Sequence, residues 1–163
     1  MLENANAPVI ELWNLPKKPF DVAVGFSNRD ATYEMTTSLH SWGYRKIGFL
    51  YVDYPRNDRA VDRRAGYRAA VRDLGLSLKP GMEVALPFGM EAGRDGLRQI
   101  LAADPDVDAV MCGSDTLAVG ALMEAMRLGC RVPQDVAITG FGDVELAREL
   151  VPSLTTVRIP RAE

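Results

Sequence analysis

The chain has 163 residues, of which 47% are hydrophobic and 25% are charged, and its formal net charge is −3. This length suits one domain with an adequate core, or one domain plus fragments of another. The negative charge argues against a nucleic-acid surface on the chain as a whole. Residues 1–13 lack the pattern of a secretory signal, and no apolar run is long enough to span a bilayer, so we expect a cytoplasmic protein without membrane contact.

Hydrophobic periodicity predicts strands that alternate with helices over most of the chain. The expected strands cover residues 9–13, 22–26, 46–52, 83–86, 107–112, 136–140 and 154–159. The expected helices cover residues 29–41, 57–74, 89–103 and 114–128. Strands and helices in this order form right-handed crossovers and a parallel sheet that is covered on both faces. The fold class is therefore α/β, with a doubly wound parallel sheet.

The first two expected strands are separated only by the turn-rich segment 14–19, without a helix of their own. That arrangement is unusual for a doubly wound domain, so these strands are expected to belong to an incomplete unit.

The two cysteines, Cys112 and Cys130, have no metal-ligand spacing. They suit a reducing compartment and a buried thiol.

Two polar clusters follow neighbouring strands in the segment 109–143. Residues 113–115 (Gly-Ser-Asp) follow the first strand, and residues 140–143 (Gly-Phe-Gly-Asp), interpreted as a tight turn, follow the second. The carboxyl ends of parallel strands face one crevice, which is where open α/β sheets bind ligands. Ser114 is a good N-cap and Asp115 complements the helix dipole, roles that are compatible with ligand binding at the same place.

Arg63 lies four residues before Tyr67, on the helix face that also carries Ala70 and Val71 and is expected to pack on the sheet. An arginine on such a face needs an anion or a set of carbonyls, because an unpaired buried charge is costly. Two interpretations stay open. Arg63 contacts a ligand, or it extends outward or pairs with an acid such as Asp53.

No pattern in the sequence indicates catalysis. His40 is the only histidine and has no partner at a useful spacing, and neither a GxGxxG motif nor a Walker loop occurs. The alternating acids Asp104, Asp106 and Asp108 lack the glycine and the closing glutamate of a calcium loop. We therefore expect neither an enzyme nor a metal or cofactor site.

Four segments resemble the effector-binding domain of LacI/GalR-type transcriptional regulators. They are VGFSNRDATYEMTTSLHSWGYRKIGFL (24–50), DRRAGYRAAV (62–71), VDAVMCGSDTLAVGALMEAMRLGCRVPQDVAITGFGD (107–143) and PSLTTVRIP (152–160). The similarity covers nearly the whole chain and is closest to the gluconate-utilisation repressor branch. It implies a periplasmic-binding-protein-like (type I) domain with one lobe nearly complete. Residues 1–27 would end the first lobe, 28–152 would form the second lobe, and 153–163 would cross back.

The resemblance also implies partners. In this family a small effector binds between the lobes, and the protein acts as a homodimeric repressor. It binds operator DNA through a helix-turn-helix headpiece, which is expected to lie outside this chain. The family's effector-binding positions fall on Trp13, Phe26, Arg63, Ser114, Gly142 and Asp143.

Departures from the family pattern concern charge. Gly142 stands where an acid is usual, and the region of Trp13 lacks the acid often found after the first-lobe strand, while Arg63 is kept. An arginine without neighbouring carboxylates favours an anionic ligand, so a sugar acid such as gluconate is expected. Two other functions stay open at this point: a periplasmic sugar-binding protein of the same fold, and an α/β enzyme.

Overall fold

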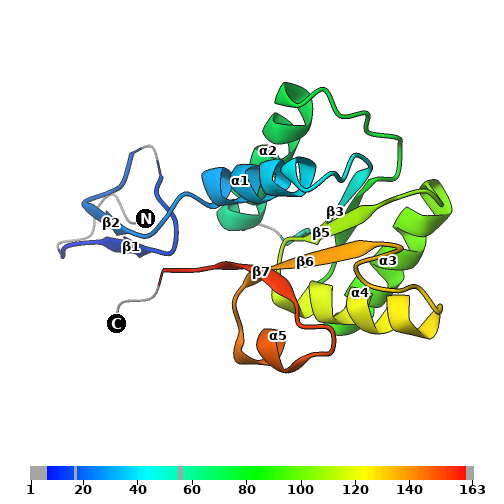
Figure 1. The fold of residues 1–163 in the computed structure, drawn as a ribbon. Helices are drawn as coiled ribbons and strands as arrows, with labels where there is room; N and C mark the ends of the chain where they lie inside the picture. The colour runs from blue at the N-terminus through cyan, green and yellow to red at the C-terminus, as the bar shows by residue number, and fades with distance from the viewer. Residues whose placement is uncertain (1–6, 17, 55–56, 161–163) are drawn as a thin grey trace.

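The main element of the computed structural model, which describes residues 7–16, 18–54 and 57–160, is a five-stranded parallel sheet. Its strands run in the order β4-β3-β5-β6-β7. Their bounds are β3 (Ile47–Val52), β4 (Glu83–Leu86), β5 (Ala109–Cys112), β6 (Ala137–Gly142) and β7 (Thr155–Arg158). A second sheet pairs β1 (Ile10–Leu12) in parallel with β2 (Val22–Val24) and lies beside the main sheet (Figure 1).

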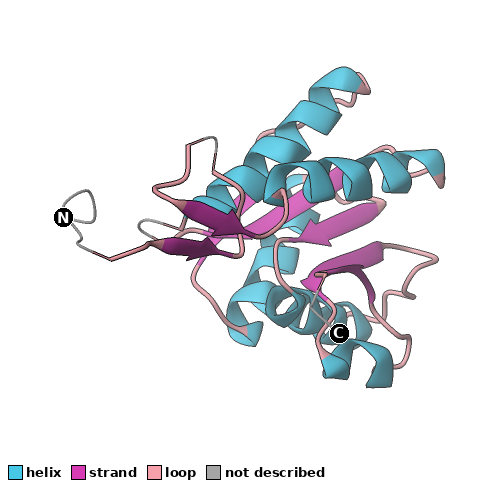
Figure 2. Cartoon of the chain, turned by 90° about the vertical axis from the view of Figure 1, so that its left-hand side faces the viewer, coloured by secondary structure: helices cyan, strands magenta, loops and turns pink. Residues whose placement is uncertain are grey.

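Helices cover both faces of the main sheet, as the strand–helix alternation predicts (Figures 1 and 2). The helices α1 (Asn28–Ser41) and α2 (Asp58–Asp73) lie on one face, and α3 (Met90–Ala103) and α4 (Asp115–Arg127) lie on the other. A short fifth helix, α5 (Glu145–Glu149), lies between β6 and β7 in the chain. This arrangement confirms the α/β fold class with a doubly wound parallel sheet.

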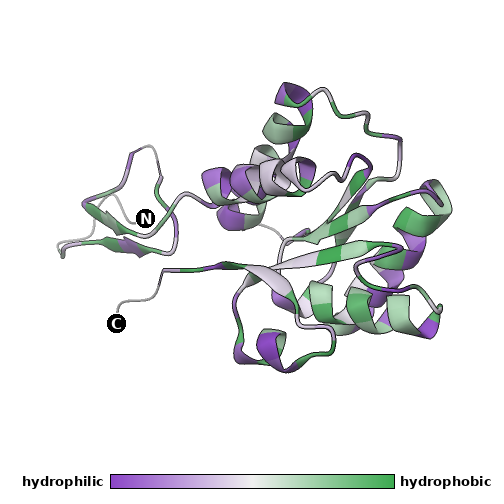
Figure 3. Ribbon diagram, in the orientation of Figure 1, coloured by the Kyte–Doolittle hydropathy of each residue, from purple (hydrophilic) through white to green (hydrophobic). Residues whose placement is uncertain are grey.

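Two apolar clusters hold these layers together. The cluster under α1 and α2 contains Leu39, Phe49, Tyr67 and Met111, all almost completely buried. The larger cluster under α3 and α4 contains, among others, Leu50, Val84, Leu97, Ile100, Val110, Cys112, Leu117 and Leu122. Hydrophobic residues accordingly concentrate on the central strands, and hydrophilic ones lie on the outer helix faces (Figure 3). Burying one such side chain contributes about 1.5–3 kcal/mol.

One expectation about the end of β6 is wrong, and one short helix after it is not predicted from the sequence. Residues 140–142 are not a tight polar turn, because β6 continues to Gly142 and pairs with β7 through Gly140, Phe141 and Gly142. Phe141 is buried in this pairing rather than part of a polar cluster. The helix α5 was not expected, since five residues are too few to show helical periodicity.

Helix ends follow the capping chemistry of the sequence. The side chains of Ser27, Asn57 and Ser114 each accept a hydrogen bond from a backbone N–H in the first turn of α1, α2 and α4 respectively. Within the described part of the chain, no helix is long and apolar enough to cross a membrane.

Candidate functional site

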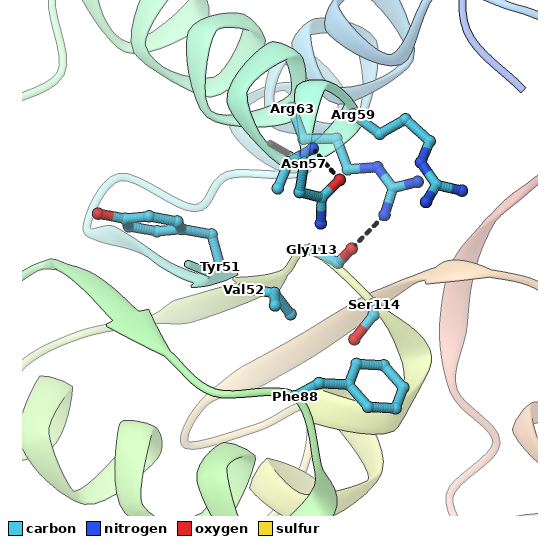
Figure 4. A pocket seen from close by; sticks show the side chains of 9 residues that line it. Tyr51, Val52, Asn57, Arg59, Arg63, Phe88, Gly113 and Ser114 are labelled. Atoms are coloured by element: carbon cyan, nitrogen blue, oxygen red, sulfur yellow. Dashed lines mark hydrogen bonds between the residues drawn. The ribbon is translucent and has the colours of Figure 1, made fainter. Parts of the chain in front are cut away.

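A cavity opens at the carboxyl ends of β3, β4 and β5, on the edge of the sheet where open α/β folds bind ligands (Figure 4). It has a volume of about 240 Å³ and is open to solvent, which is somewhat below the roughly 300–1,000 Å³ that is usual for small-molecule sites. Four segments contribute to it: the end of β3, the start of α2, the loop after β4 and the turn after β5. The lining residues are Tyr51, Val52, Asn57, Arg59, Ala60, Arg63, Phe88, Gly113 and Ser114.

The charge of this cavity is positive. Arg59 and Arg63 both line it, and none of the described residues that line it is acidic. Asn57 and Ser114 add polar groups, and Phe88, two-thirds exposed, adds an apolar ring. A mixture of cationic, hydrogen-bonding and apolar groups is typical of a site that orients a small polar ligand.

Arg63 is held by hydrogen bonds to neutral groups rather than by an ion pair. Its Nε donates to Asn28 Oδ1 at 2.8 Å, and its Nη1 donates to the backbone carbonyl of Gly113 at 2.6 Å. Its Cζ lies 3.8 Å from the centre of the Phe141 ring, a cation–π distance. Within the described ranges, no carboxylate forms a salt bridge with Arg63, so the alternative pairing with Asp53 is not observed.

The environment of Arg63 disfavours its positive charge. Removal from water and, to a smaller extent, the like charge of Arg59 lower the pKa of Arg63 to about 10, against the opposing effect of Asp115. The guanidinium is still charged at neutral pH, yet it lacks the counter-charge that usually offsets desolvation. An anion in the cavity would supply that counter-charge.

The packing of α1 against α2 brings Arg63 to this position. Gly66, one helical turn after Arg63, lies so close to α1 that a Cβ atom there would overlap the carbonyl oxygen of Arg29. The two helices therefore cross at the first turn of α1, next to Asn28. This close approach explains how Arg63 Nε reaches a side chain that lies 35 positions earlier in the sequence.

Ser114 and Asp115 have different roles at the start of α4. Ser114 Oγ accepts a hydrogen bond from the backbone N–H of Leu117 at 3.3 Å while Ser114 also lines the cavity. Asp115 is almost completely buried; it accepts hydrogen bonds from the Val144 backbone N–H at 2.9 Å and from the Thr156 hydroxyl at 2.5 Å. Asp115 thus ties α4 to the strand ends of β6 and β7.

Four other residues predicted for the site lie around the cavity and do not line it. Phe26 stacks on Phe141 with ring centres 6.1 Å apart, behind Arg63. Trp13 is half exposed, and its carbonyl accepts a hydrogen bond from Asn28. Gly142, at the end of β6, lies beside Asp115, and Asp143 pairs with Arg158 at 2.7 Å.

Sequence reasoning missed several residues of the site. Asn28 and Phe141 contact Arg63 from α1 and β6, and Phe88 and Asn57 complete the cavity wall. Asn57 is the first residue of the helix predicted over 57–74, whereas Asn28 and Phe141 reach Arg63 only through tertiary contacts. Among the residues that the structure describes, no group of three or more His, Cys, Asp or Glu side chains could hold a metal ion.

Comparisons with known proteins agree with the fold. A family model described as "Periplasmic binding protein-like domain" matches residues 36–163. The HTH-type transcriptional regulator GntR of Escherichia coli K12 is 36% identical over 161 residues, which are 99% of this chain and 48% of that protein. The HTH-type transcriptional regulator IdnR of the same strain is 35% identical over 164 residues, with 98% of this chain and 48% of that protein covered.

Solved structures give the same result. A LacI family transcriptional regulator from Silicibacter pomeroyi superposes with a TM-score of 0.91 and 38% identity, over 98% of this chain and 59% of that one. The chain spans about half the length of the curated relatives it matches. The predicted resemblance to LacI-type regulators is confirmed, and these relatives are regulators rather than enzymes.

Proposed function

The chain belongs to the periplasmic-binding-protein-like domain family, in the form carried by LacI-type transcriptional regulators, and we propose that it senses a sugar acid such as gluconate for a repressor of this type. The observation that supports an acidic effector is a cavity lined by two arginines and, among the described residues, by no carboxylate. A desolvated guanidinium in such a cavity is stabilised by an anion and gains less from a neutral ligand.

The free edge of Arg63 suits a carboxylate. Its Nε–H and one Nη1–H are used by Asn28 and Gly113, which leaves the second Nη1–H and both Nη2–H groups. Two parallel N–H donors match the two oxygens of a carboxylate. Asn57 and Ser114 would then bind hydroxyl groups, and the ring of Phe88 would cover the carbon chain.

The proposed sensor has two lobes and works within a larger DNA-binding protein. Residues 1–27 would end a first lobe, 28–152 would form the second, and 153–163 would cross back, so that the effector lies between lobes. Trp13, Phe26, Gly142 and Asp143 would complete the effector site from around the cavity. The whole regulator would act as a cytoplasmic homodimer and bind operator DNA through a headpiece outside this chain.

Titration calorimetry with sugars of different charge tests the nature of the effector. We expect gluconate to bind more tightly than neutral galactose or ribose, because only gluconate offers a carboxylate to Arg63. Tighter binding of galactose or ribose than of gluconate would disprove the sugar-acid proposal.

Replacing Arg63 tests its role in the site. We expect Arg63→Ala to weaken gluconate binding by about 2–3 kcal/mol, or roughly 30- to 150-fold, because a charge-assisted pair is lost. Arg68→Ala is the matched control, since Arg68 lies on the same helix but pairs with Glu83 away from the cavity. Equal affinities of the Arg63 variant and of the unmodified protein would remove Arg63 from the site.

A further inference from the structure

Asn28 is completely buried at the first position of α1, and it makes the only side-chain hydrogen bond to the Nε of Arg63 among the described residues. The distance between Asn28 Oδ1 and Arg63 Nε is 2.8 Å. A buried amide has the geometry to fix the plane of a guanidinium, because Nε is the donor nearest the flexible stem of the arginine.

The amide of Asn28 can face Arg63 in only one orientation. Its Nδ2 donates to the Trp13 carbonyl at 3.0 Å and to Asn14 Oδ1 at 3.1 Å, and both of these partners are acceptors. Reversing the amide would place an oxygen against two acceptors and an NH₂ group against Arg63, so all three hydrogen bonds would be lost. The contacts with Trp13 and Asn14 therefore keep Oδ1 directed at Arg63.

The turn that supplies these two acceptors is itself anchored to both neighbours. The Trp13 N–H donates to the Val24 carbonyl at 3.0 Å, which joins the turn to the small β1–β2 sheet. Asn14 Nδ2 donates to Asp62 at 2.8 Å and to Asp58 at 3.0 Å, two carboxylates on the first turns of α2. A continuous path of hydrogen bonds thus runs from the segment before α1, through Asn28, to Arg63.

We propose that Asn28 is the positioning residue of Arg63, and that it makes the orientation of the guanidinium depend on the Trp13–Asn14 turn. With Nε and one Nη1–H engaged, the remaining N–H groups of Arg63 are directed to the cavity in a fixed plane. Displacement of the turn releases the Asn28 amide and, with it, the plane of Arg63. The consequence for effector affinity rests on the proposed function; the positioning itself does not.

The positioning is tested without ligand by nuclear magnetic resonance of the arginine side chains. The Nε–H signal of Arg63 is identified by its loss in Arg63→Lys, and its exchange with water is then measured. We expect Asn28→Ala to speed this exchange, because the acceptor is gone. Asn14→Ala, which touches no hydrogen bond of Arg63 itself, should speed it to a smaller extent.

Thr36→Val is the matched control for a change inside α1. Thr36 is equally buried, but its hydroxyl donates to the Thr32 carbonyl and contacts Met111 Sδ, away from Arg63. We expect this variant to leave both the Nε–H exchange and gluconate binding unchanged. Asn28→Ala should weaken gluconate binding about tenfold, the effect of losing roughly one well-placed hydrogen bond.

Asn28→Asp keeps the size of the side chain and serves if Asn28→Ala does not fold. It retains an acceptor for Arg63 Nε–H but loses both donors to the Trp13–Asn14 turn, so the exchange should be faster than in Thr36→Val. Its carboxylate neutralises Arg63 and should weaken gluconate binding. Unchanged Nε–H exchange in Asn28→Ala overturns the positioning role, and exchange in Asn28→Asp as slow as in Thr36→Val overturns the dependence on the Trp13–Asn14 turn. If the unmodified protein does not bind gluconate, the proposed function fails, and the exchange rates still decide the role of Asn28.

Discussion

Single residues determine the charge of the cavity. Arg63 is desolvated and forms no salt bridge among the described residues. The nearby carboxylate that raises its pKa, Asp115, already accepts hydrogen bonds from the Val144 N–H and the Thr156 hydroxyl. A carboxylate that already accepts two hydrogen bonds is poorly available to a neighbouring arginine. The positive charge of the site therefore depends both on the number of nearby carboxylates and on the hydrogen bonds that these carboxylates already accept.

Gly142 shows how this arrangement excludes a second acid. Its φ of 139° is a backbone conformation that L side chains rarely adopt, and a Cβ atom there would lie 3.1 Å from Asp115 Oδ2. We expect Gly142→Asp to lower the free energy of unfolding by about 2 kcal/mol or more, from backbone strain and from repulsion between adjacent carboxylates.

Urea denaturation measures this effect, and Gly142→Ala separates its two causes. The alanine variant carries the backbone strain without the charge, so it should lose less stability than the aspartate variant. Gly142→Asp as stable as the unmodified protein would show that the end of β6 relaxes, and that an acid at this position is compatible with the structure.

The sequence indicates some of these residues and misses others for a physical reason. Helical spacing places Arg63 on the packed face of α2, and the capping preference of serine identifies Ser114, because both signals are local. Asn28 and Asn14 meet Arg63 and Asp62 across 35 and 48 positions of chain. No local pattern carries such a contact, since it depends on the crossing of α1 and α2.

Among the elements, the seven strands and the four long helices agree with the predicted order. Most of them have a buried face that creates a periodic pattern, whereas the short strands β1 and β2 contain no buried residue. The end of β6 was missed because glycine and an adjacent aspartate resemble a turn, whereas pairing with β7 keeps Gly140 and Gly142 in the sheet. The sequence of β6 alone does not show that a later strand, β7, pairs with its last residues.

Glu83 joins two elements that the sequence treats separately, namely the edge strand β4 and the helix α2. Its carboxylate accepts hydrogen bonds from Arg64 and Arg68, each at 2.8 Å. Partial burial alone raises the pKa of Glu83, but the hydrogen bonds from Arg68 and Arg64 outweigh it, so the pKa lies below its ordinary 4.5. The stabilisation is therefore fully present above pH 4.5 and is lost as the pH falls through the lower, folded-state pKa.

We expect Glu83→Gln to lower the free energy of unfolding by about 1 kcal/mol at pH 7 and to flatten its decline below pH 4.5. Chemical denaturation at several pH values measures both effects. Asp95→Asn is the control, because the Arg94–Asp95 pair is more exposed and such pairs contribute little. The same decline below pH 4.5 in Glu83→Gln and in the unmodified protein would contradict the role of Glu83.

At the scale of the whole molecule, the small sheet presents an apolar face to solvent. Ile10 and Leu12 of β1 are paired in register with Val22 and Val24 of β2, and all four side chains are between 50% and 62% exposed. Paired residues on parallel strands point to the same face, so these side chains form one continuous apolar surface. Exposed strands with such a face tend to associate.

We expect the apparent mass of the protein to rise with concentration, and to rise less in the double variant Leu12→Glu, Val24→Lys. These two positions are directly paired, so the new charges attract each other and the sheet is kept. Sedimentation velocity at several concentrations measures the association. The control Val61→Lys removes a single exposed apolar side chain from α2, and its apparent mass should rise as in the unmodified protein. If Val61→Lys reduces the rise as much as the double variant does, the small sheet does not cause the association.

The contact between Gly66 and the Arg29 carbonyl also limits how the molecule can move. Because backbone touches backbone at that point, α2 cannot slide along α1 without steric overlap. A movement of α2 that opens or closes the cavity must therefore carry α1 with it, as a rotation about segments outside the pair. Motion of this kind is a hinge and not a shear, so the link between Asn28 and Arg63 travels intact with the rotating body. The movement changes the hydrogen bonds that the Trp13–Asn14 turn makes with Asn28 and with the start of α2.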